Sequence, residues 1–158
     1  MIIISDSSPL ISLALIGNLS LLEKLYNEIY VPTAVYEEVV KSDKPFSNEL
    51  KQFLSGRIKN ISNKMAVEIL LSDIGAGEAE AIVLALEQQP DIILIDDLKA
   101  RKFAKLKGLR VIGTMGILLE AKQEGLIKEI KPLISELVSK DIRISTEIVE
   151  ITLQAAQE

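Results

Sequence analysis

Acidic residues stand at positions in this chain where carboxylates could take part in phosphodiester chemistry. Asp6 ends a segment that begins with three consecutive Ile residues, and two Asp residues close the apolar run IILI. Carboxylates gathered at one edge of a sheet repel one another unless a cation neutralises them. The acidic positions concerned are Asp6, Glu38, Glu78, Glu80, Asp96 and Asp97. We therefore predict a metal site built from acidic side chains.

The residue types that the chain lacks narrow the chemistry further. There is no His and no Cys, which excludes a Ser-His-Asp triad, imidazole ligands, a thiolate zinc site and a cysteine nucleophile. Hydrolysis of a phosphodiester needs an activated water and stabilisation of the charge at the attacked phosphate, and carboxylate-bound metal ions supply both. Carboxylates suit hard cations, so the expected cofactor is Mg2+ or Mn2+.

Each acidic residue also has an ordinary structural interpretation. Asp6 and Asp97 stand where helices are expected to begin, and Asp is a favoured N-cap residue. Glu38 could be a surface residue of a helix. Glu78 and Glu80 are two positions apart, so on a helix their side chains diverge by about 200°. We expect one of this pair to have another role, such as capping a helix or binding Arg.

Apolar runs and helical periodicities alternate along the chain, which predicts an α/β fold with three layers, a parallel sheet flanked by helices. The strands are expected at residues 2–5, 28–31, 57–61, 91–95 and 109–112. The helices are expected at residues 10–15, 19–26, 33–40, 46–54, 78–88, 98–107, 115–125, about 127–139 and 146–156. Residues 65–71 fit either state, residues 41–45 form a polar turn, residues 75–77 form a loop, and the polar tail after Ile151 frays.

Length and composition bound the kind of protein. The 158 residues predict one domain over residues 1–158, with a C-terminal helical extension from about residue 131. No apolar run reaches the roughly 18 residues of a membrane span, so we expect a soluble, cytoplasmic protein without a membrane partner. The net charge of −5 argues against a broad positive field but leaves room for a local basic groove.

Four segments together resemble the PIN-domain nucleases, in the PIN-related branch close to VapC-type toxins. The first covers residues 3–26 and ends in PLISLALIGNLSLLEKLY, and the others are VPTAVYEEV, GEAEAIVLALE and IILIDDLKARKFAKLKGLRVIGTMGILLEAKQEGLI. Together they cover about residues 1–130. The specific pair is the motif at residues 6–11, Asp-Ser-Ser-Pro-Leu-Ile, followed by GEAEAI in this order and spacing. The resemblance implies a PIN-like, Rossmann-like fold and a metal-dependent ribonuclease.

The resemblance also implies roles for individual residues. Asp6 matches the aspartate of the first strand, Glu38 the helix glutamate, and Asp97 the aspartate after the fourth strand, with Asp96 left open as an alternative. Many VapC-type chains have an Asp in the helix before that strand, where this chain has Glu80, with Glu78 as a neighbouring candidate.

RNA is the implied substrate, and a basic rim near the acids should receive its phosphates. The residues that could form this rim are Lys99, Arg101, Lys102, Lys105, Lys107 and Arg110. Ser8 and Thr114 could orient a water or a phosphate, or could act as helix caps. The alternative for the basic segment is a solvated amphipathic helix with Phe103 and Leu106 facing inward. Few aromatic residues are present, so base stacking should add little sequence selectivity.

Partners and other functions follow from the same resemblance. It implies a homodimer and a cognate antitoxin, with residues 11–26 and 46–54 as candidate interfaces unless core packing explains them. A PIN-like binding or regulatory module that does not cut RNA is the second hypothesis, supported by the Glu at position 80. Two other functions do not fit the residues after the first strand. A phosphoacceptor domain would need an acidic pair there and a dehalogenase-like phosphatase would need Asp-x-Asp, whereas the chain has Asp6-Ser7-Ser8.

Overall fold

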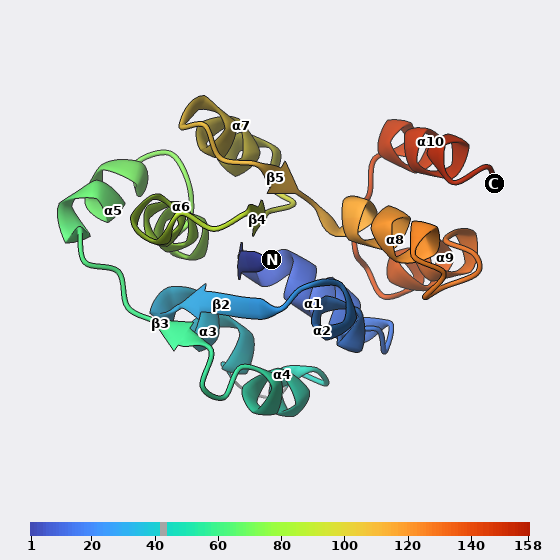
Figure 1. The fold of residues 1–158 in the computed structure, drawn as a ribbon, viewed down its shortest axis with the longest axis horizontal. Coiled ribbons are helices and arrows are strands. Elements are labelled where there is room, and N and C mark those ends of the chain that lie inside the picture. The colour runs from blue at the N-terminus through green and yellow to red at the C-terminus, as the bar shows by residue number, and fades with distance from the viewer. Residues whose placement is uncertain (42–43) are drawn as a thin grey trace.

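The computed structural model describes residues 1–41 and 44–158 and contains a parallel β-sheet between layers of helices (Figure 1). The strands in this part of the chain are β1 Ile2–Ser5, β2 Glu28–Pro32, β3 Ile58–Lys59, β4 Ile92–Leu94 and β5 Val111–Ile112. Their order in the sheet is β3-β2-β1-β4-β5, and every neighbouring pair is parallel. The predicted α/β class with a parallel sheet is therefore confirmed.

The central strands are apolar because helices cover both of their faces. Successive side chains of a strand point to opposite faces, so Ile3 joins one core cluster and Ile4 the other, and both are fully buried. In β4, Ile92 and Ile93 divide between the clusters in the same way. A strand buried on both faces reads as a continuous apolar run, which is why the sequence located β1 and β4 so well.

The helices of the described residues divide between the two core clusters. The first cluster takes buried residues from α1 Ser7–Leu15, α2 Ser20–Leu25, α3 Thr33–Val40, α4 Ser47–Phe53, α8 Thr114–Gln123 and α9 Lys131–Ser139, and residues of α10 Thr146–Ala155 pack against it. The second takes buried residues from α5 Lys64–Leu70, α6 Ala76–Gln88 and α7 Leu98–Leu106. The sheet thus lies in a three-layer arrangement.

Several boundaries differ from the sequence predictions. The segment that fitted either state is the helix α5, and the Asn63 side chain caps it by accepting the Ala66 backbone N–H at 3.0 Å. The loop expected at residues 75–77 is shorter, because α6 already begins at Ala76. Helix α9 begins only at Lys131, with Pro132 in its first turn, where proline is favoured. The polar turn predicted for residues 41–45 includes residues 42 and 43, which lie outside the described residues.

The sequence predicts that the C-terminal tail frays, but in the structure the tail is ordered. Helix α10 continues to Ala155, and the Glu158 carboxylate accepts the backbone N–H groups of Ile130 and Lys131. Lys122 Nζ donates to the Ala156 carbonyl at 2.7 Å and to Glu158 at 2.9 Å. These bonds hold the polar tail against α8 and the start of α9.

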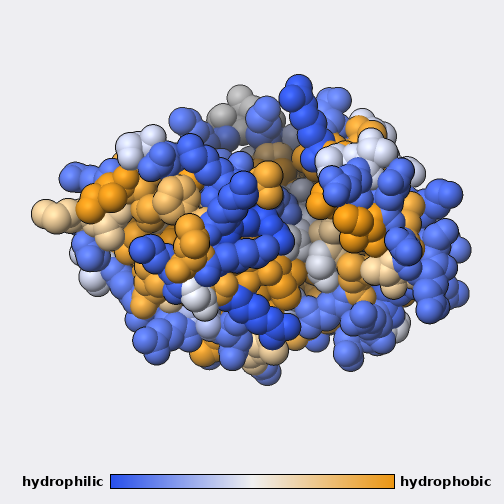
Figure 2. All heavy atoms as spheres, turned by 90° about the horizontal axis from the view of Figure 1, so that it is seen from above, coloured by the Kyte–Doolittle hydropathy of each residue, from blue (hydrophilic) through white to orange (hydrophobic). Residues whose placement is uncertain are grey.

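The two segments considered as interfaces are part of the core. Leu13 and Leu22 in the first segment and Leu50 and Leu54 in the second are fully buried. Core packing therefore accounts for their apolar character. No helix within residues 1–41 and 44–158 is long and apolar enough to cross a membrane. Figure 2 looks down on α7 and α10, and hydrophilic side chains cover much of that face.

The topology brings several helix N-termini to one edge of the sheet. Helices α1, α7 and α8 each begin directly after a strand, at the carboxyl end of β1, β4 and β5 respectively. Helix N-termini carry free backbone N–H groups and a partial positive charge, which favour anions. In open α/β sheets, ligands bind at this edge. Asp6, Asp96 and Asp97 lie on the connections that form it.

Candidate active site at the carboxyl edge of the sheet

Asp6 is the most deeply buried acid at this edge. It follows β1, its backbone N–H donates to the Leu94 carbonyl at 2.9 Å, and it is only 2% exposed. The pKa of Asp6 is raised from its ordinary 3.8 to about 7, chiefly by burial and also by the charges of Glu78, Glu38 and Asp96, while the Ser7 backbone N–H lowers it. Acids from four separate segments therefore act on one another electrostatically.

Glu38 and Asp6 face the same small space beside Gly77. A Cβ atom built on Gly77 would lie 2.8 Å from Glu38 Oε2 and 3.3 Å from Asp6 Oδ1. The Ser7 hydroxyl donates to Glu38 Oε2 at 3.0 Å and holds it in this position. A side chain at position 77 would displace these carboxylates, so the glycine keeps the space open.

Sequence reasoning did not identify Ser7 or Gly77 as site residues. Ser7 was only part of the motif at residues 6–11, and residue 77 was placed in a loop, whereas it lies buried in the first turn of α6. The available signal was the pairing of the two motifs. The first motif supplies Asp6 and Ser7, and GEAEAI begins with the glycine that packs against them.

Glu78 and Glu80 diverge, as their spacing predicts. Glu80 Oε1 accepts the Ala34 backbone N–H at 3.1 Å and so caps the start of α3. Glu78 bends back toward Gly75, where a built Cβ would lie 2.6 Å from Glu78 Oε2. Of the two, Glu78 is the residue whose charge raises the pKa of Asp6.

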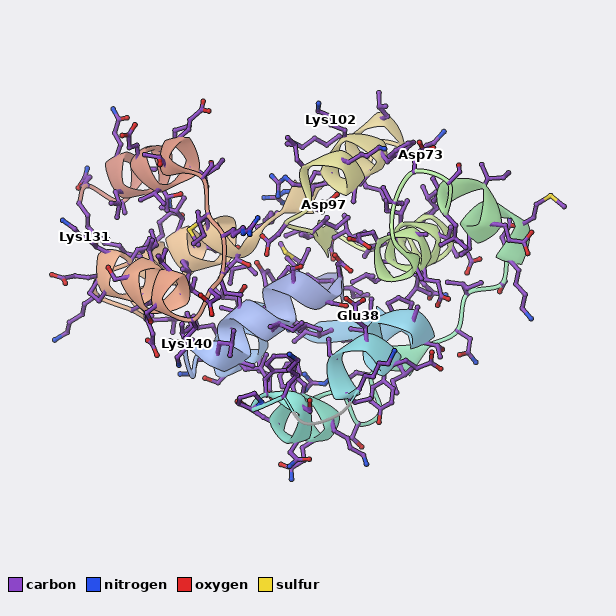
Figure 3. The ribbon with its side chains drawn as sticks, turned by 180° about the vertical axis from the view of Figure 1, so that it is seen from behind. Glu38, Asp73, Asp97, Lys102, Lys131 and Lys140 are labelled. Carbon is purple, nitrogen blue, oxygen red and sulfur yellow. The ribbon has the colours of Figure 1, made fainter. Side chains whose placement is uncertain are left out.

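Asp96 and Asp97 are also separated by their contacts. Asp97 accepts the Ala100 backbone N–H at 2.9 Å and caps α7. Asp96 accepts the backbone N–H of Thr114 at 2.7 Å and the Thr114 hydroxyl at 2.6 Å. It is Asp96 whose charge acts on Asp6. In Figure 3, Glu38 on α3 and Asp97 at the start of α7 lie toward the middle of the molecule, whereas Lys131 lies at the far end beside α9.

The donor set at this edge fits a hard divalent cation. In the described parts of the chain, no three acidic side chains lie close enough together to form a complete metal site by themselves. The groups present are carboxylate and hydroxyl oxygens, the ligands that Mg2+ and Mn2+ prefer. Burial and the negative charges of nearby acids both raise the pKa of Asp6, and a bound cation would favour its ionised form. The chemistry of the residues therefore suits the expected metal.

The basic residues lie on α7 and on the residues directly after it, and all of them except the half-buried Arg101 are exposed. Lys102 and Lys105 are exposed, and Lys99 makes an exposed ion pair with Asp73 at 3.7 Å. Phe103 packs against the second core cluster as expected. The prediction that Leu106 faces inward is wrong, because Leu106 is 82% exposed and the small residues Ala100 and Ala104 fill the inner face instead.

The two hydroxyl residues named as RNA contacts occupy different environments. Ser8 is exposed in the first turn of α1, two positions after Asp6. Thr114 is only 4% exposed and donates both its hydroxyl and its backbone N–H to Asp96. The structure therefore gives Thr114 a supporting contact with an acid of the site.

Comparison with known proteins gives one match. The model of a protein family described as a PIN domain matches residues 2–158. Searches of curated proteins and of solved structures find no match. The matched region includes the C-terminal helices, and its description does not specify the VapC-type branch.

Proposed function

Because this chain belongs to the PIN-domain family, whose members are typically nucleases, we propose that it is an endoribonuclease that requires Mg2+ or Mn2+ and hydrolyses phosphodiester bonds of cytoplasmic RNA. The observation that carries this proposal is the environment of Asp6. A buried carboxylate whose pKa is raised to about 7 beside three further acids is a typical feature of a functional site. At an ordinary structural position, such a group would be costly.

The proposed metal ligands are Asp6, Glu38, Glu78 and Asp96. When bound, the metal would activate a water and stabilise charge at the attacked phosphate. The Ser7 hydroxyl orients Glu38, and Thr114 orients Asp96 through two hydrogen bonds. Such supporting contacts fix the direction of a ligand before the ion binds.

Two residues assigned by resemblance change their proposed role. Glu80 and Asp97 were expected to be catalytic, but each accepts a backbone N–H at a helix N-terminus. Their neighbours Glu78 and Asp96 instead act on the pKa of Asp6. We therefore place Glu78 and Asp96 among the ligands and treat Glu80 and Asp97 as residues that stabilise α3 and α7.

RNA would approach across the exposed face of α7. Lys99 and Lys102 stand on the two turns that follow Asp97, and both are exposed. Such lysines bind phosphates without reading sequence. Ser8, exposed beside Asp6, is the proposed hydroxyl contact with the RNA backbone.

The role of toxin in a toxin–antitoxin pair, a cognate antitoxin that covers the acidic site, and a homodimer are further parts of the proposal. They rest on the resemblance of the sequence to VapC-type proteins. The acidic character of the site supports an antitoxin with a basic segment, because opposite charges favour association.

A second candidate function is an RNA-binding or regulatory module without catalysis. The observation that favours it is the lack, among the described residues, of three acids close enough to form a complete metal site. Such a module would bind RNA through α7 and leave it intact.

The test is hydrolysis of a labelled single-stranded RNA with Mg2+, with Mn2+ and with EDTA. We expect cleavage with a metal and none with EDTA. Asp6→Asn should reduce cleavage more than about a hundredfold, the scale of losing a contact that orients or binds a catalytic metal. The matched control is Asp141→Asn, at an exposed position with a φ of 65° that Asn tolerates. RNA binding without metal-dependent cleavage would favour the non-catalytic module.

A further inference from the structure

Arg101 differs from the other basic residues of α7 because its side chain is fixed against the end of the sheet. Its Nη1 donates to the Ile95 carbonyl at 2.8 Å, and the residue is half-buried. Lys102 and Lys105 of the same helix are exposed. Since a guanidinium keeps its charge at any pH in which the protein folds, α7 holds a permanent positive charge at the carboxyl end of β4.

Gly113 shows how close this charge lies to the acidic site. A Cβ atom built on Gly113 would stand 2.8 Å from Arg101 Nη1 and 2.8 Å from Asp96 Oδ1, with the Ile95 carbonyl at 3.4 Å. The guanidinium and a proposed ligand carboxylate therefore border the same small space. Only a residue without a side chain leaves that space open.

Most of the hydrogen-bonding capacity of Arg101 is left for a ligand. A guanidinium has five N–H donors in a planar fork. Within residues 1–41 and 44–158, the acceptor it contacts is the Ile95 carbonyl, and it makes no ion pair with a carboxylate. A half-buried cation with free donors beside a proposed phosphodiester site matches the geometry of a phosphate group, which arginine binds through two parallel hydrogen bonds.

We propose that Arg101 binds a non-bridging phosphate oxygen of RNA at the acidic site and positions the phosphodiester for cleavage. This inference rests on the proposed function. The exposed lysines of α7 would add affinity along the RNA backbone, whereas Arg101 sets which phosphate meets the carboxylates. Its anchoring to the Ile95 carbonyl means that it is in place before RNA arrives.

Binding and cleavage can be measured separately. In an Asp6→Asn background, in which cleavage should be reduced more than about a hundredfold, the affinity for a fluorescent single-stranded RNA is measured by anisotropy over a range of salt concentrations. Arg101→Met should weaken binding about tenfold and reduce the slope of log affinity against log salt by about 0.7, the contribution of one phosphate contact on a single strand. The matched control is Lys131→Met, which removes one exposed charge at the far end of the molecule from Asp97 (Figure 3) and should change affinity less than about twofold.

Arg101→Lys tests for a purely structural role. Lysine keeps the charge and a donor for the Ile95 carbonyl but lacks the fork, so the Arg101→Lys chain should unfold at the wild-type temperature. With residue 6 intact, it should still cleave RNA about tenfold more slowly than the wild type. The proposal is overturned if Arg101→Met binds RNA like Lys131→Met, or if Arg101→Lys binds and cleaves RNA as well as the wild type does. If the wild type binds RNA through Arg101 but never cleaves it, the ribonuclease proposal fails, and the phosphate contact of Arg101 stands without its role in cleavage.

Discussion

The side chains of Asp6 and Glu158 each lie at the N-terminus of a helix, Asp6 at α1 and Glu158 at α9, but their pKa values shift in opposite directions. Burial and neighbouring acids raise the pKa of Asp6 to about 7. Backbone N–H groups of Ile130 and Lys131, together with Lys122, lower the pKa of Glu158 to about 2. The Glu158 side chain thus receives hydrogen bonds and a positive counter-charge from the folded chain. The Asp6 side chain instead lies near other negatively charged side chains.

The difference separates an acid whose charge the fold stabilises from an acid that we propose binds a metal. Glu158 makes bonds that only the folded chain provides, so its charge stabilises the fold. Asp6 costs the fold stability whenever it is ionised, and a bound cation would remove that cost. The comparison therefore supports the carboxyl edge of the sheet as the place of the proposed metal site.

The largest expected effect comes from filling the space at Gly77. Gly77→Ala would press a methyl group against Glu38 and Asp6, and a displacement of about 1 Å at a catalytic site can cost about a hundredfold in rate. We expect that loss in metal-dependent RNA cleavage. The control is Gly17→Ala, at a φ of 66° with open space around it, which should lower stability and leave the rate per folded molecule unchanged. Equal rates for both variants would refute the placement of the acids.

The next largest expected effect is the stabilisation of the folded chain by divalent cations bound at the sheet edge. At a Mg2+ or Mn2+ concentration one hundred times the dissociation constant, binding to the folded state alone adds about 2.7 kcal/mol. Calorimetry at pH 8 should therefore show an unfolding temperature several degrees higher with metal than with EDTA. Asp6→Asn should abolish this rise, and Glu158→Gln should retain it. A rise of the same size in Asp6→Asn would place the metal elsewhere.

The dependence of stability on pH should have opposite signs in the two regions. Since folding raises the pKa of Asp6, its contribution to stability is fully present below pH 3.8 and is lost as the pH rises through about 7. In EDTA at pH 8, Asp6→Asn should therefore be more stable than the wild type by at least the value of one pKa unit, about 1.4 kcal/mol.

Substitution of Glu158 tests the opposite dependence of stability on pH. Since folding lowers its pKa, its contribution is present above pH 4.5 and is lost as the pH falls toward 2. Glu158→Gln should therefore unfold at a lower temperature than the wild type at neutral pH, with the difference shrinking in acid. Denaturation curves of both variants across the pH range measure this, and shifts of the same sign would contradict the comparison.

The smallest expected effects are those of removing one charge from either of the two glutamates of α6. Glu80→Gln weakens a bond to the Ala34 backbone N–H and should cost about 0.5–1.5 kcal/mol with little change in cleavage. Glu78→Gln should do the reverse, reducing cleavage and lowering the pKa of Asp6, because one neighbouring charge is removed. Urea denaturation and cleavage assays on both variants distinguish them. Loss of cleavage in Glu80→Gln alone would restore the assignment made by resemblance.

The sequence by itself determined the architecture and the kind of chemistry. Apolar runs of strand length between helical periodicities required a covered parallel sheet, because strand and helix patterns are local properties of the chain. The absence of His and Cys left side-chain oxygens as the main ligands available for a metal, and Asp6 at the end of its strand predicted the edge of the sheet at which we propose the site.

Only the tertiary structure decided which member of each acidic pair acts on the pKa of Asp6. Glu80 accepts the backbone N–H of Ala34 in a distant segment, and Asp96 accepts the N–H and hydroxyl of the distant Thr114. Asp97, by contrast, caps its own helix at Ala100, a contact that its sequence position predicted. The roles of Gly77 and Glu158 depend likewise on partners at least 27 residues away in the chain. Such contacts follow from how packed elements orient side chains toward one another, which no local pattern records.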